Sequence, residues 1–420
     1  MPELLRVATA GSVDDGKSTL IGRLLYDSKS LFDDQLEHVE QVSRRRGDEY
    51  TDLALLTDGL RAEREQGITI DVAYRYFATP RRSFILADTP GHVQYTRNMV
   101  TGASTTDVAI ILVDARNGLT DQSRRHAVLA ALLGVEHVVV CVNKMDLVDW
   151  SQDVFDRVVG EFEDFSARLR TPDLEFIPIS ALHGDNVVER GTNSPWYDGT
   201  PLLRYLEHVH VAGDRNLTDV RLPVQLVIRP HSTEHHDHRG YAGMVAGGVL
   251  RAGDRIRVLP SGFESVISGI LGPDGPVEEA FPGMSVQVLL EDDIDISRGD
   301  MICRPANTPT STQDLDTTVC WMDETSALTP GTMYAIKHTT RWARARVAGL
   351  EYRLDTNTLH RDLNAEALQL NDIGRVRLRV SLPLFVDPYE TNRETGSFIL
   401  VDEGTNRTVG AGIVLARARA

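Results

Sequence analysis

Residues 11–20, GSVDDGKSTL, constrain the fold of this chain more than any other stretch. They place Gly11, Gly16, Lys17 and Ser18 in the spacing of a phosphate-binding loop. The glycines let backbone N–H groups converge on an anion. The lysine reaches the β- and γ-phosphates of a nucleotide, and the serine offers a hydroxyl to Mg²⁺. A strand-like run precedes the loop and a helical pattern follows it, as this mechanism requires. The expected phosphate contacts are Asp14, Asp15, Gly16, Lys17, Ser18 and Thr19.

The first half of the chain alternates between strand-like and helical patterns. Continuous apolar runs suit strands that are buried on both faces of a mainly parallel sheet. A helical pattern over 121–133 stops before Gly134. A last helix is expected over 200–209, with Thr200 as a candidate N-cap and Pro201 at the first helical position. We therefore predict an α/β nucleotide-binding domain over residues 1–212. The strand-like runs are 4–10, 83–88, 108–115, 137–143 and 175–180.

The sequence pattern changes near residue 220, from alternating strand-like and helical segments to strand-like segments. Short β-rich runs such as LPVQLVIR and DRIRVLP alternate with Gly, Pro and Asp turns, and a second block of this kind begins after the linker RPANTPTSTQ. Many short strands with evenly spaced turns indicate small barrels. We predict a β-barrel over 218–308 and another over 313–420, both following an α/β P-loop domain.

A second motif, DTPGH, spans residues 88–92 at the end of an apolar run. Asp88 can hold Mg²⁺ through water, and Gly91 can donate its backbone N–H to the γ-phosphate. The alternative interpretation is an ordinary Pro-Gly turn.

A third motif, NKMD, spans residues 143–146 just past another strand-like run. The Asp146 carboxylate accepts hydrogen bonds from N1–H and N2–H₂ of guanine, a donor pair that adenine lacks. The stem of Lys144 can lie along the base. After the next run comes SAL, Ser180 to Leu182, in which the Ala181 amide is expected to meet guanine O6. Together with Asn143, these residues predict a guanine site.

Composition narrows the class of protein. Lys and Arg total 44, yet only Lys17, Lys29, Lys144 and Lys337 are lysines, and two of those four fall in the nucleotide motifs. A compact ammonium at these two places fits phosphate and base binding. The net charge of −17 does not favour nucleic-acid binding through an overall basic field. Three cysteines, no signal-peptide pattern and no apolar run of ~18 residues favour a cytoplasmic protein without a membrane span.

Taken together and in this order, the motifs resemble those of translational-type GTPases, the elongation factor Tu and elongation factor 1-alpha superfamily. The resemblance extends over the whole chain. It implies that EQGITI at 65–70 is a switch in which Thr69 binds Mg²⁺ and the γ-phosphate. It further implies that His92 orients the attacking water, and that Val13 and Ile68 flank His92 as an apolar gate. Asp14 matches a position beside the phosphates where a monovalent cation can bind.

Several segments resemble the GTPase subunits of ATP sulfurylases (sulfate adenylyltransferase subunit 1) more closely. The resemblance implies GTP hydrolysis coupled to the reaction of ATP and sulfate to adenosine 5′-phosphosulfate and pyrophosphate. Adenylyl transfer is then expected on a separate catalytic subunit in a heteromer. Asp15 and Thr89 replace residues common in translation factors, whereas Leu182 departs from a frequent lysine. The matching segments are GSVDDGKSTLIGRLLYDSK, TDGLRAEREQGITIDVAYRYF, LADTPGHVQYTRNMVTGAST, LVDARNGLTDQSRRHA and HRGYAGMVAGGVLRAGDRIRVLPSG.

Two other functions stay open at this point, a GTPase that delivers tRNA and a scaffold that does not hydrolyse its nucleotide. A partner surface is also expected in the last domain, where Trp342, Arg344 and Arg346 alternate onto one strand face near Lys337. The alternative is an ordinary solvated strand face.

Overall fold

A computed structural model describes residues 3–28, 53, 72–90, 96–169, 173–211, 216–229 and 239–415. The chain divides into two compact units, one formed by residues 1–211 with 356–359 and one by residues 212–355 with 360–420. Each unit is described by itself below. Within the described ranges, no helix is long and apolar enough to cross a membrane.

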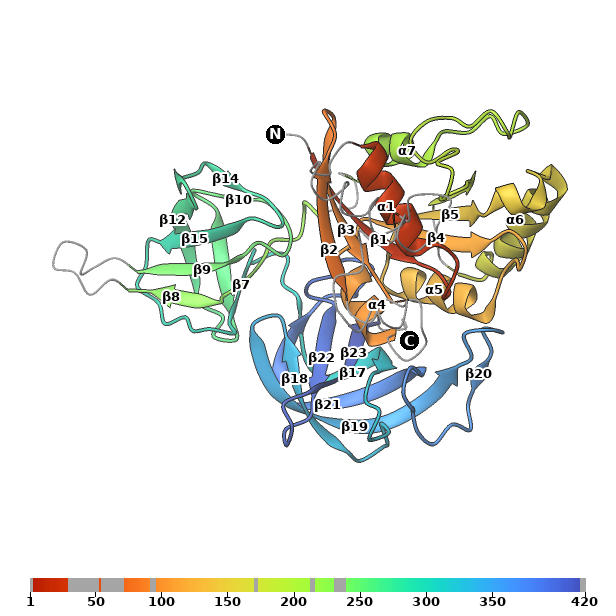
Figure 1. Cartoon of the computed structure of the whole chain (residues 1–420). Helices are drawn as coiled ribbons and strands as arrows, with labels where there is room; N and C mark the ends of the chain where they lie inside the picture. Colours follow the sequence, from red (N-terminus) through yellow and green to blue (C-terminus); the bar gives the residue numbers. More distant parts are fainter. Residues whose placement is uncertain are drawn as a thin grey trace. The chain divides into compact units, whose positions relative to one another are not determined.

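A six-stranded sheet forms the centre of the first unit, with the order β2-β3-β1-β4-β5-β6. All neighbours pair in parallel except β2, which pairs antiparallel with β3 and lies at the edge of the sheet (Figure 1). The five parallel strands confirm the strand-like runs read from the sequence, while β2 was not predicted. Their bounds are β1 (Glu3–Ala10), β2 (Ala73–Ala78), β3 (Arg82–Asp88), β4 (Val108–Asp114), β5 (His137–Asn143) and β6 (Asp173–Pro178).

Helices connect the strands of this sheet. The phosphate-binding loop opens α1 as predicted. The side chain of Thr120 caps α5 by accepting from the Ser123 amide at 3.2 Å, and Gly134 beyond its end has a φ of 63°. Pro201 lies at the N-cap of α7 rather than in its first turn. The helices are α1 (Lys17–Asp27), α4 (Thr96–Ala103), α5 (Asp121–Leu132), the 3₁₀ helix η3 (Met145–Val148), α6 (Gln152–Ser166) and α7 (Leu202–His208).

The apolar core of the first unit lies where the parallel strands meet the helices. Every residue of β4 is buried, and Leu5 and Leu24 are fully enclosed. A strand buried on both faces cannot shift its register without exposing apolar side chains, so the ends of these strands are fixed in space. The loops that leave β1, β3, β4 and β5 therefore begin from fixed points along one edge of the sheet.

The second unit begins with a barrel whose strands follow the order β7-β16-β11-β12-β15-β9-β8. The segment 221–228 closes this ring, because its first part, β7, pairs with β16 and its last part, β8, pairs with β9. Val220, Tyr241 and Ile256 belong to the buried core inside. The strands are β7 (Arg221–Pro223), β8 (Leu226–Ile228), β9 (Gly240–Met244), β11 (Arg255–Leu259), β12 (Glu264–Gly272), β15 (Ser285–Leu290) and β16 (Met301–Cys303), with short β10 (Leu250–Arg251), β13 (Gly275–Pro276) and β14 (Glu279–Ala280).

The last barrel closes through a direct ladder. Its strands run β18-β22-β23-β17-β21-β19, and β19 pairs back with β18, so that six strands form a closed ring. Trp321 is fully buried in its core. The fold class predicted from the sequence, an α/β P-loop domain followed by two small β-barrels, is confirmed. The strands are β17 (Thr310–Trp321), β18 (Met333–His338), β19 (Arg341–Leu354), β20 (Arg361–Asp362), β21 (Ile373–Val386), β22 (Ser397–Val401) and β23 (Thr408–Val414).

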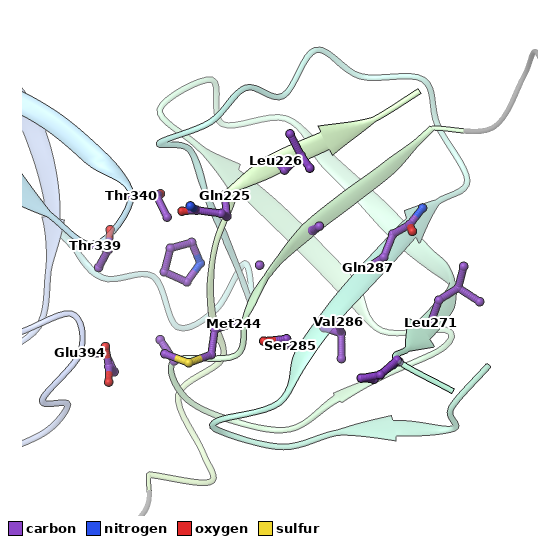
Figure 2. A pocket seen from close by; sticks show the side chains of 16 residues that line it. Gln225, Leu226, Met244, Leu271, Ser285, Val286, Gln287, Thr339, Thr340 and Glu394 are labelled. Atoms are coloured by element: carbon purple, nitrogen blue, oxygen red, sulfur yellow. The ribbon is translucent and has the colours of Figure 1, made fainter. Parts of the chain in front are cut away.

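The two barrels of the second unit enclose a cavity of about 570 Å³ between them (Figure 2). Strands β9 and β15 of the first barrel form one side of it. The turn between β18 and β19 and the loop that carries Glu394 form the other.

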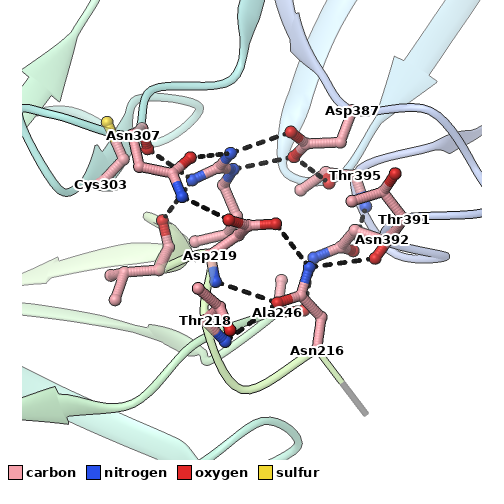
Figure 3. Close-up of polar contacts among 12 residues, drawn as sticks. Asn216, Thr218, Asp219, Ala246, Cys303, Asn307, Asp387, Thr391, Asn392 and Thr395 are labelled. Carbon is pink, nitrogen blue, oxygen red and sulfur yellow. Dashed lines mark hydrogen bonds and ion pairs between the residues drawn. The ribbon is translucent and has the colours of Figure 1, made fainter. Parts of the chain in front are cut away.

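A polar network joins the barrels beside this cavity (Figure 3). Arg221 is 2% exposed and makes two hydrogen bonds to Asp387, from Nε to Oδ2 at 2.8 Å and from Nη2 to Oδ1 at 2.9 Å. Its Nη1 also donates to the Asn307 carbonyl at 2.8 Å. Nearby, Asn392 Nδ2 donates to the Ala246 carbonyl at 2.9 Å. Because a paired guanidinium and carboxylate are taken out of water here, breaking the pair from one side is costly.

Candidate nucleotide site

The phosphate-binding loop leaves β1 and takes a conformation that depends on glycine. Gly16 has a φ of 93°, and a Cβ atom there would lie 2.5 Å from Asn143 Nδ2. Residues with a side chain rarely adopt this φ, and a Cβ atom here would force the Asn143 amide to move. Asp14 has a φ of 68°, which aspartate tolerates better than most residues. The loop is therefore shaped by its own backbone and by the close approach of the base-binding motif.

Lys17 lies inside the loop and is buried. Its Nζ donates to the carbonyls of Gly11 at 2.9 Å and Ser12 at 3.0 Å. Burial lowers the pKa of Lys17, although the carboxylates of Asp88 and Asp15 oppose this shift. The carbonyls of Gly11 and Ser12 thus hold the Lys17 ammonium within the loop that is expected to bind the phosphates.

Asp15 is buried at the base of the loop. Its Oδ2 accepts from the Ser12 amide at 2.6 Å, and burial raises the pKa of the Asp15 carboxyl. Because this side chain already binds its own loop, we assign it to shaping the loop; the direct phosphate contact expected of Asp15 stays a prediction. Ser18 and Thr19 are half-buried in the first turn of α1.

Asp88 ends β3 directly beside β1, where the parallel register pairs it with Thr9. It is 2% exposed and lies near enough to Lys17 to act on its charge. The next residue, Thr89, donates from Oγ1 to the Thr9 carbonyl at 2.5 Å, which anchors the start of the DTPGH segment. A carboxylate here and the Ser18 hydroxyl supply oxygen atoms, the donors that Mg²⁺ prefers. This donor chemistry fits the metal site expected from the sequence.

Asn143 connects three loops. Its Nδ2 donates to the Asp15 carbonyl at 2.7 Å, and its Oδ1 accepts from the Ala181 amide at 2.9 Å. The sequence assigned the Ala181 amide to guanine O6, whereas in this structure that amide binds Asn143. The contact between this amide and O6 stays a prediction.

Asp146 has an oxygen atom suited to a ligand. Its Oδ1 is buried and has no hydrogen-bond partner among the residues that the structure describes. His183 Nε2 lies 3.9 Å from the other oxygen, Oδ2. A buried acceptor without a partner is costly, and the N–H donors of guanine would satisfy it. The arrangement fits the base-reading role predicted for Asp146.

The SAL segment is held by the first helix. Arg23 donates from Nε to the Ala181 carbonyl at 3.3 Å and from Nη2 to the Leu182 carbonyl. Ser180 Oγ accepts from the His183 amide at 3.3 Å. The backbone carbonyl of Leu182 therefore helps to hold this segment on the first helix. A leucine in place of the frequent lysine does not change this backbone contact.

The sequence did not single out Asp114, at the end of β4. Lys144 Nζ lies 3.0 Å from Asp114 Oδ2 and also donates to the Asp14 carbonyl. Arg116 donates to both carboxylate oxygens, to Oδ1 at 3.0 Å and to Oδ2 at 2.6 Å. Burial alone would raise the pKa of Asp114, but these cationic donors hold it at about 2. The charge of Lys144 is thereby fixed between the base motif and the phosphate loop.

Comparison with known proteins identifies the family. Residues 2–219 match the elongation factor Tu GTP binding domain, and residues 314–415 match the GTP-eEF1A C-terminal domain-like family. Sulfate adenylyltransferase subunit 1 of Bacteroides fragilis is 51% identical over 417 residues, which cover 99% of this chain and 86% of that protein. The corresponding subunit of Pseudoalteromonas atlantica is 50% identical over 98% of this chain and 87% of its own length. The chain belongs to the sulfate adenylyltransferase subunit 1 family.

A bifunctional enzyme CysN/CysC of Mycobacterium tuberculosis is also similar to this member of the subunit 1 family. It is 65% identical over 415 residues, which cover 99% of this chain and 68% of that enzyme. The similarity therefore includes both barrels as well as the nucleotide site.

Four predicted residues lie outside the described residues: Gly91 of the DTPGH motif, and Ile68, Thr69 and His92, whose roles the resemblance to translational-type GTPases implies. Val13, the other proposed gate residue, is 38% exposed in the phosphate loop. Their roles stay predictions.

On the last barrel of this subunit 1 family member, some side chains of the expected partner surface already contact other residues of the same barrel. Lys337 pairs with Trp342 across β18 and β19, with Nζ 5.8 Å from the indole centroid, and Trp342 is 47% exposed. Arg344 Nε lies 2.8 Å from Glu403 Oε1. Arg346 is exposed on the same face. The exposed cations and the indole do share one face, as the alternation predicted.

Proposed function

We propose that this chain is the GTP-hydrolysing regulatory subunit of a sulfate adenylyltransferase. It couples hydrolysis of GTP to the reaction of ATP and sulfate that yields adenosine 5′-phosphosulfate and pyrophosphate. The observation that carries this proposal is identity of 50% or more to subunit 1 proteins over almost the whole chain. The same observation favours this function over delivery of tRNA.

The described residues support GTP as the nucleotide. The loop backbone and Lys17 bind the phosphates, and the unpaired Oδ1 of Asp146 accepts from the guanine N–H groups. Ser18 and Asp88 would hold Mg²⁺, the latter through water, and the metal would neutralise charge that develops on the phosphates. Asn143 keeps the phosphate loop and the SAL segment in register while the nucleotide binds.

The hydrolytic step rests on residues assigned by the resemblance. His92 orients the attacking water, with Val13 and Ile68 as the apolar gate beside it. Thr69 and Gly91 contact the γ-phosphate and are released when it leaves. This release changes the affinity for a partner only if the partner binds the two nucleotide states differently.

The adenylyl transfer itself takes place on a catalytic adenylyltransferase subunit with which this chain forms a heteromer. We place that complex in the cytoplasm. The free energy released by GTP hydrolysis would then favour formation of the phosphosulfate anhydride.

The test combines this chain with a catalytic adenylyltransferase subunit, ATP and sulfate, with and without GTP. GTP should raise the yield of adenosine 5′-phosphosulfate, and His92→Ala should abolish this increase while GTP binding persists. An equal yield with and without GTP would rule out the proposal.

Base selection is tested separately with Asp146→Asn. This variant should shift preference from guanosine toward xanthosine nucleotides, because an amide donor at this place suits the xanthine 2-oxo group. Asp156→Asn, an exposed site on α6, serves as the control. Undiminished preference for GTP in Asp146→Asn would contradict the guanine assignment.

A further inference from the structure

The cavity between the two barrels has the composition of a binding site. Its volume of about 570 Å³ lies within the range of ligand sites, ~300–1,000 Å³. Thr339, Thr340 and Glu394 line one side, opposite Met244, Ser285 and Val286 (Figure 2). Apolar side chains make most of the wall, and a few hydroxyl, amide and carboxyl groups lie among them.

The walls of the cavity are fixed to each other. On the Glu394 side, Asn392 donates to the Ala246 carbonyl at 2.9 Å, and Ala246 itself lines the cavity. At the hairpin side, Arg341 Nη1 donates to the Gly299 carbonyl at 3.1 Å. The buried His338 joins these two sides, with Nε2 2.8 Å from the Thr395 carbonyl. A site held in this way loses little conformational entropy when a ligand binds.

The hairpin turn that faces the cavity has two unusual features. Thr339 has a φ of 49°, a region that β-branched residues rarely adopt. Thr340 Oγ1 is buried and has no hydrogen-bond partner among the described residues. Both features are unfavourable in the isolated chain, and a ligand that bonds to the Thr340 hydroxyl would offset one of them.

The charge of the cavity limits what can bind. Among the described residues that line it, Glu394 is the one with an ionisable side chain. Burial raises the pKa of its carboxyl, and a cation beside it would favour the ionised form. A second phosphate, sulfate or nucleotide site would place an anion beside a carboxylate, which is unfavourable. The cavity instead fits a group that combines apolar surface with a positive charge.

The rim of the cavity favours a polypeptide. Leu226 is 57% exposed and Met244 is 42% exposed there, so apolar surface continues outward from the cavity. Contiguous exposed apolar surface marks sites of protein association, and methionine adapts readily to a partner's shape. In the proposed reaction the nucleotides, sulfate and pyrophosphate are all anions. The catalytic subunit remains as the component that can present an apolar segment with a cation.

We propose that this cavity receives a segment of the catalytic adenylyltransferase subunit that carries apolar side chains and a lysine or arginine, whose cation pairs with Glu394. The proposal rests on the proposed function. It places a docking site for the catalytic subunit on the two barrels and apart from the nucleotide motifs in sequence.

The test measures the dissociation constant of the full chain for the separately purified catalytic subunit by calorimetry. Glu394→Arg and Met244→Glu should each weaken binding at least tenfold. Their matched controls are Glu366→Arg, an exposed acid of the last barrel, and Phe263→Glu, a 56% exposed side chain outside the cavity. Both controls should bind like the wild-type chain. GTP hydrolysis by the chain alone should not change in any of the four.

A third variant separates binding from folding. Thr340→Val keeps the shape of the side chain but removes the hydroxyl, so it should weaken binding several-fold without lowering the melting temperature. Wild-type affinity in Glu394→Arg and Met244→Glu would overturn the docking site. It would leave the proposed function intact if GTP still raises the yield of adenosine 5′-phosphosulfate. A wild-type chain that neither binds the catalytic subunit nor responds to GTP would overturn both.

Discussion

Lys144 Nζ lies 3.0 Å from Asp114 Oδ2, so the lysine of the base motif is paired with a carboxylate at the end of the neighbouring strand. The same ammonium donates to the Asp14 carbonyl in the phosphate loop. One carboxylate thus helps to orient the two segments that we propose bind opposite ends of the nucleotide.

We expect Asp114→Asn to weaken GDP and GTP binding by about tenfold, or ~1.4 kcal/mol. The amide cannot keep the charge-assisted bonds to Lys144 and Arg116, so both cations lose their orientation. Titration with a fluorescent GDP analogue measures the effect. Asp156→Asn on the exposed face of α6 is the control and should bind GDP like the wild-type chain.

The same carboxyl predicts a pH dependence of stability. The pKa of Asp114 is held at about 2 in the folded chain, below its ordinary value of about 3.9. A lowered pKa stabilises the fold above the ordinary value, and this stabilisation is lost as the pH falls through about 4 toward 2. The free-energy difference between the wild-type chain and Asp114→Asn should therefore shrink by on the order of 1–2 kcal/mol over that interval. Urea unfolding at a series of pH values would show this, and a constant difference would refute it.

Gly16→Ala should abolish nucleotide binding and destabilise the first unit. Its φ of 93° is unfavourable for alanine, and the new Cβ would lie 2.5 Å from Asn143 Nδ2. Gly253→Ala is a matched control, because its φ is 88° and nothing lies within 4 Å of the added Cβ. The control should lose only the conformational term, about 1 kcal/mol. Equal losses in both variants would show that the contact with Asn143 is unimportant.

The buried pair between the barrels should be far more sensitive than an exposed one. Asp387→Ala leaves the Arg221 guanidinium buried without its carboxylate and should cost about 3–5 kcal/mol. Glu403→Ala removes the partner of Arg344, whose side chain is 65% exposed, and should cost under about 1 kcal/mol. Denaturant unfolding followed by tryptophan fluorescence compares the two variants. Replacing Arg221 and Asp387 together by apolar residues should cost less than the sum of the single changes.

Much of the nucleotide site could be predicted from the sequence because its motifs encode backbone geometry. The glycine spacing around Lys17 requires a loop of fixed shape, and continuous apolar runs required the buried parallel strands that fix where each loop begins. Strand β2 was missed because its burial alternates, with Tyr74 and Tyr76 exposed, and does not form a continuous run. An edge strand carries a weaker signal than a central one.

The contacts between loops could not be predicted. Asp114 lay within the predicted strand-like run 108–115, and its partners lie two and thirty residues further along the chain. The acceptor of the Ala181 amide could not be predicted either, because every residue except proline has a backbone N–H and the sequence does not show which oxygen accepts from it. Such pairs are set by the order of strands in the sheet, which motif spacing does not contain.

Asn143 has a consequence for attempts to transplant this nucleotide site. A chimaera that moved residues 11–20 into a protein without an asparagine at the corresponding place would lose the acceptor and donor that Asn143 provides, since Asn143 binds both the Asp15 carbonyl and the Ala181 amide. The phosphate loop, the NKMD motif and the SAL segment therefore depend on one another structurally, although more than a hundred residues separate the first from the other two. Exchange between relatives is expected to preserve function only when all three are moved together.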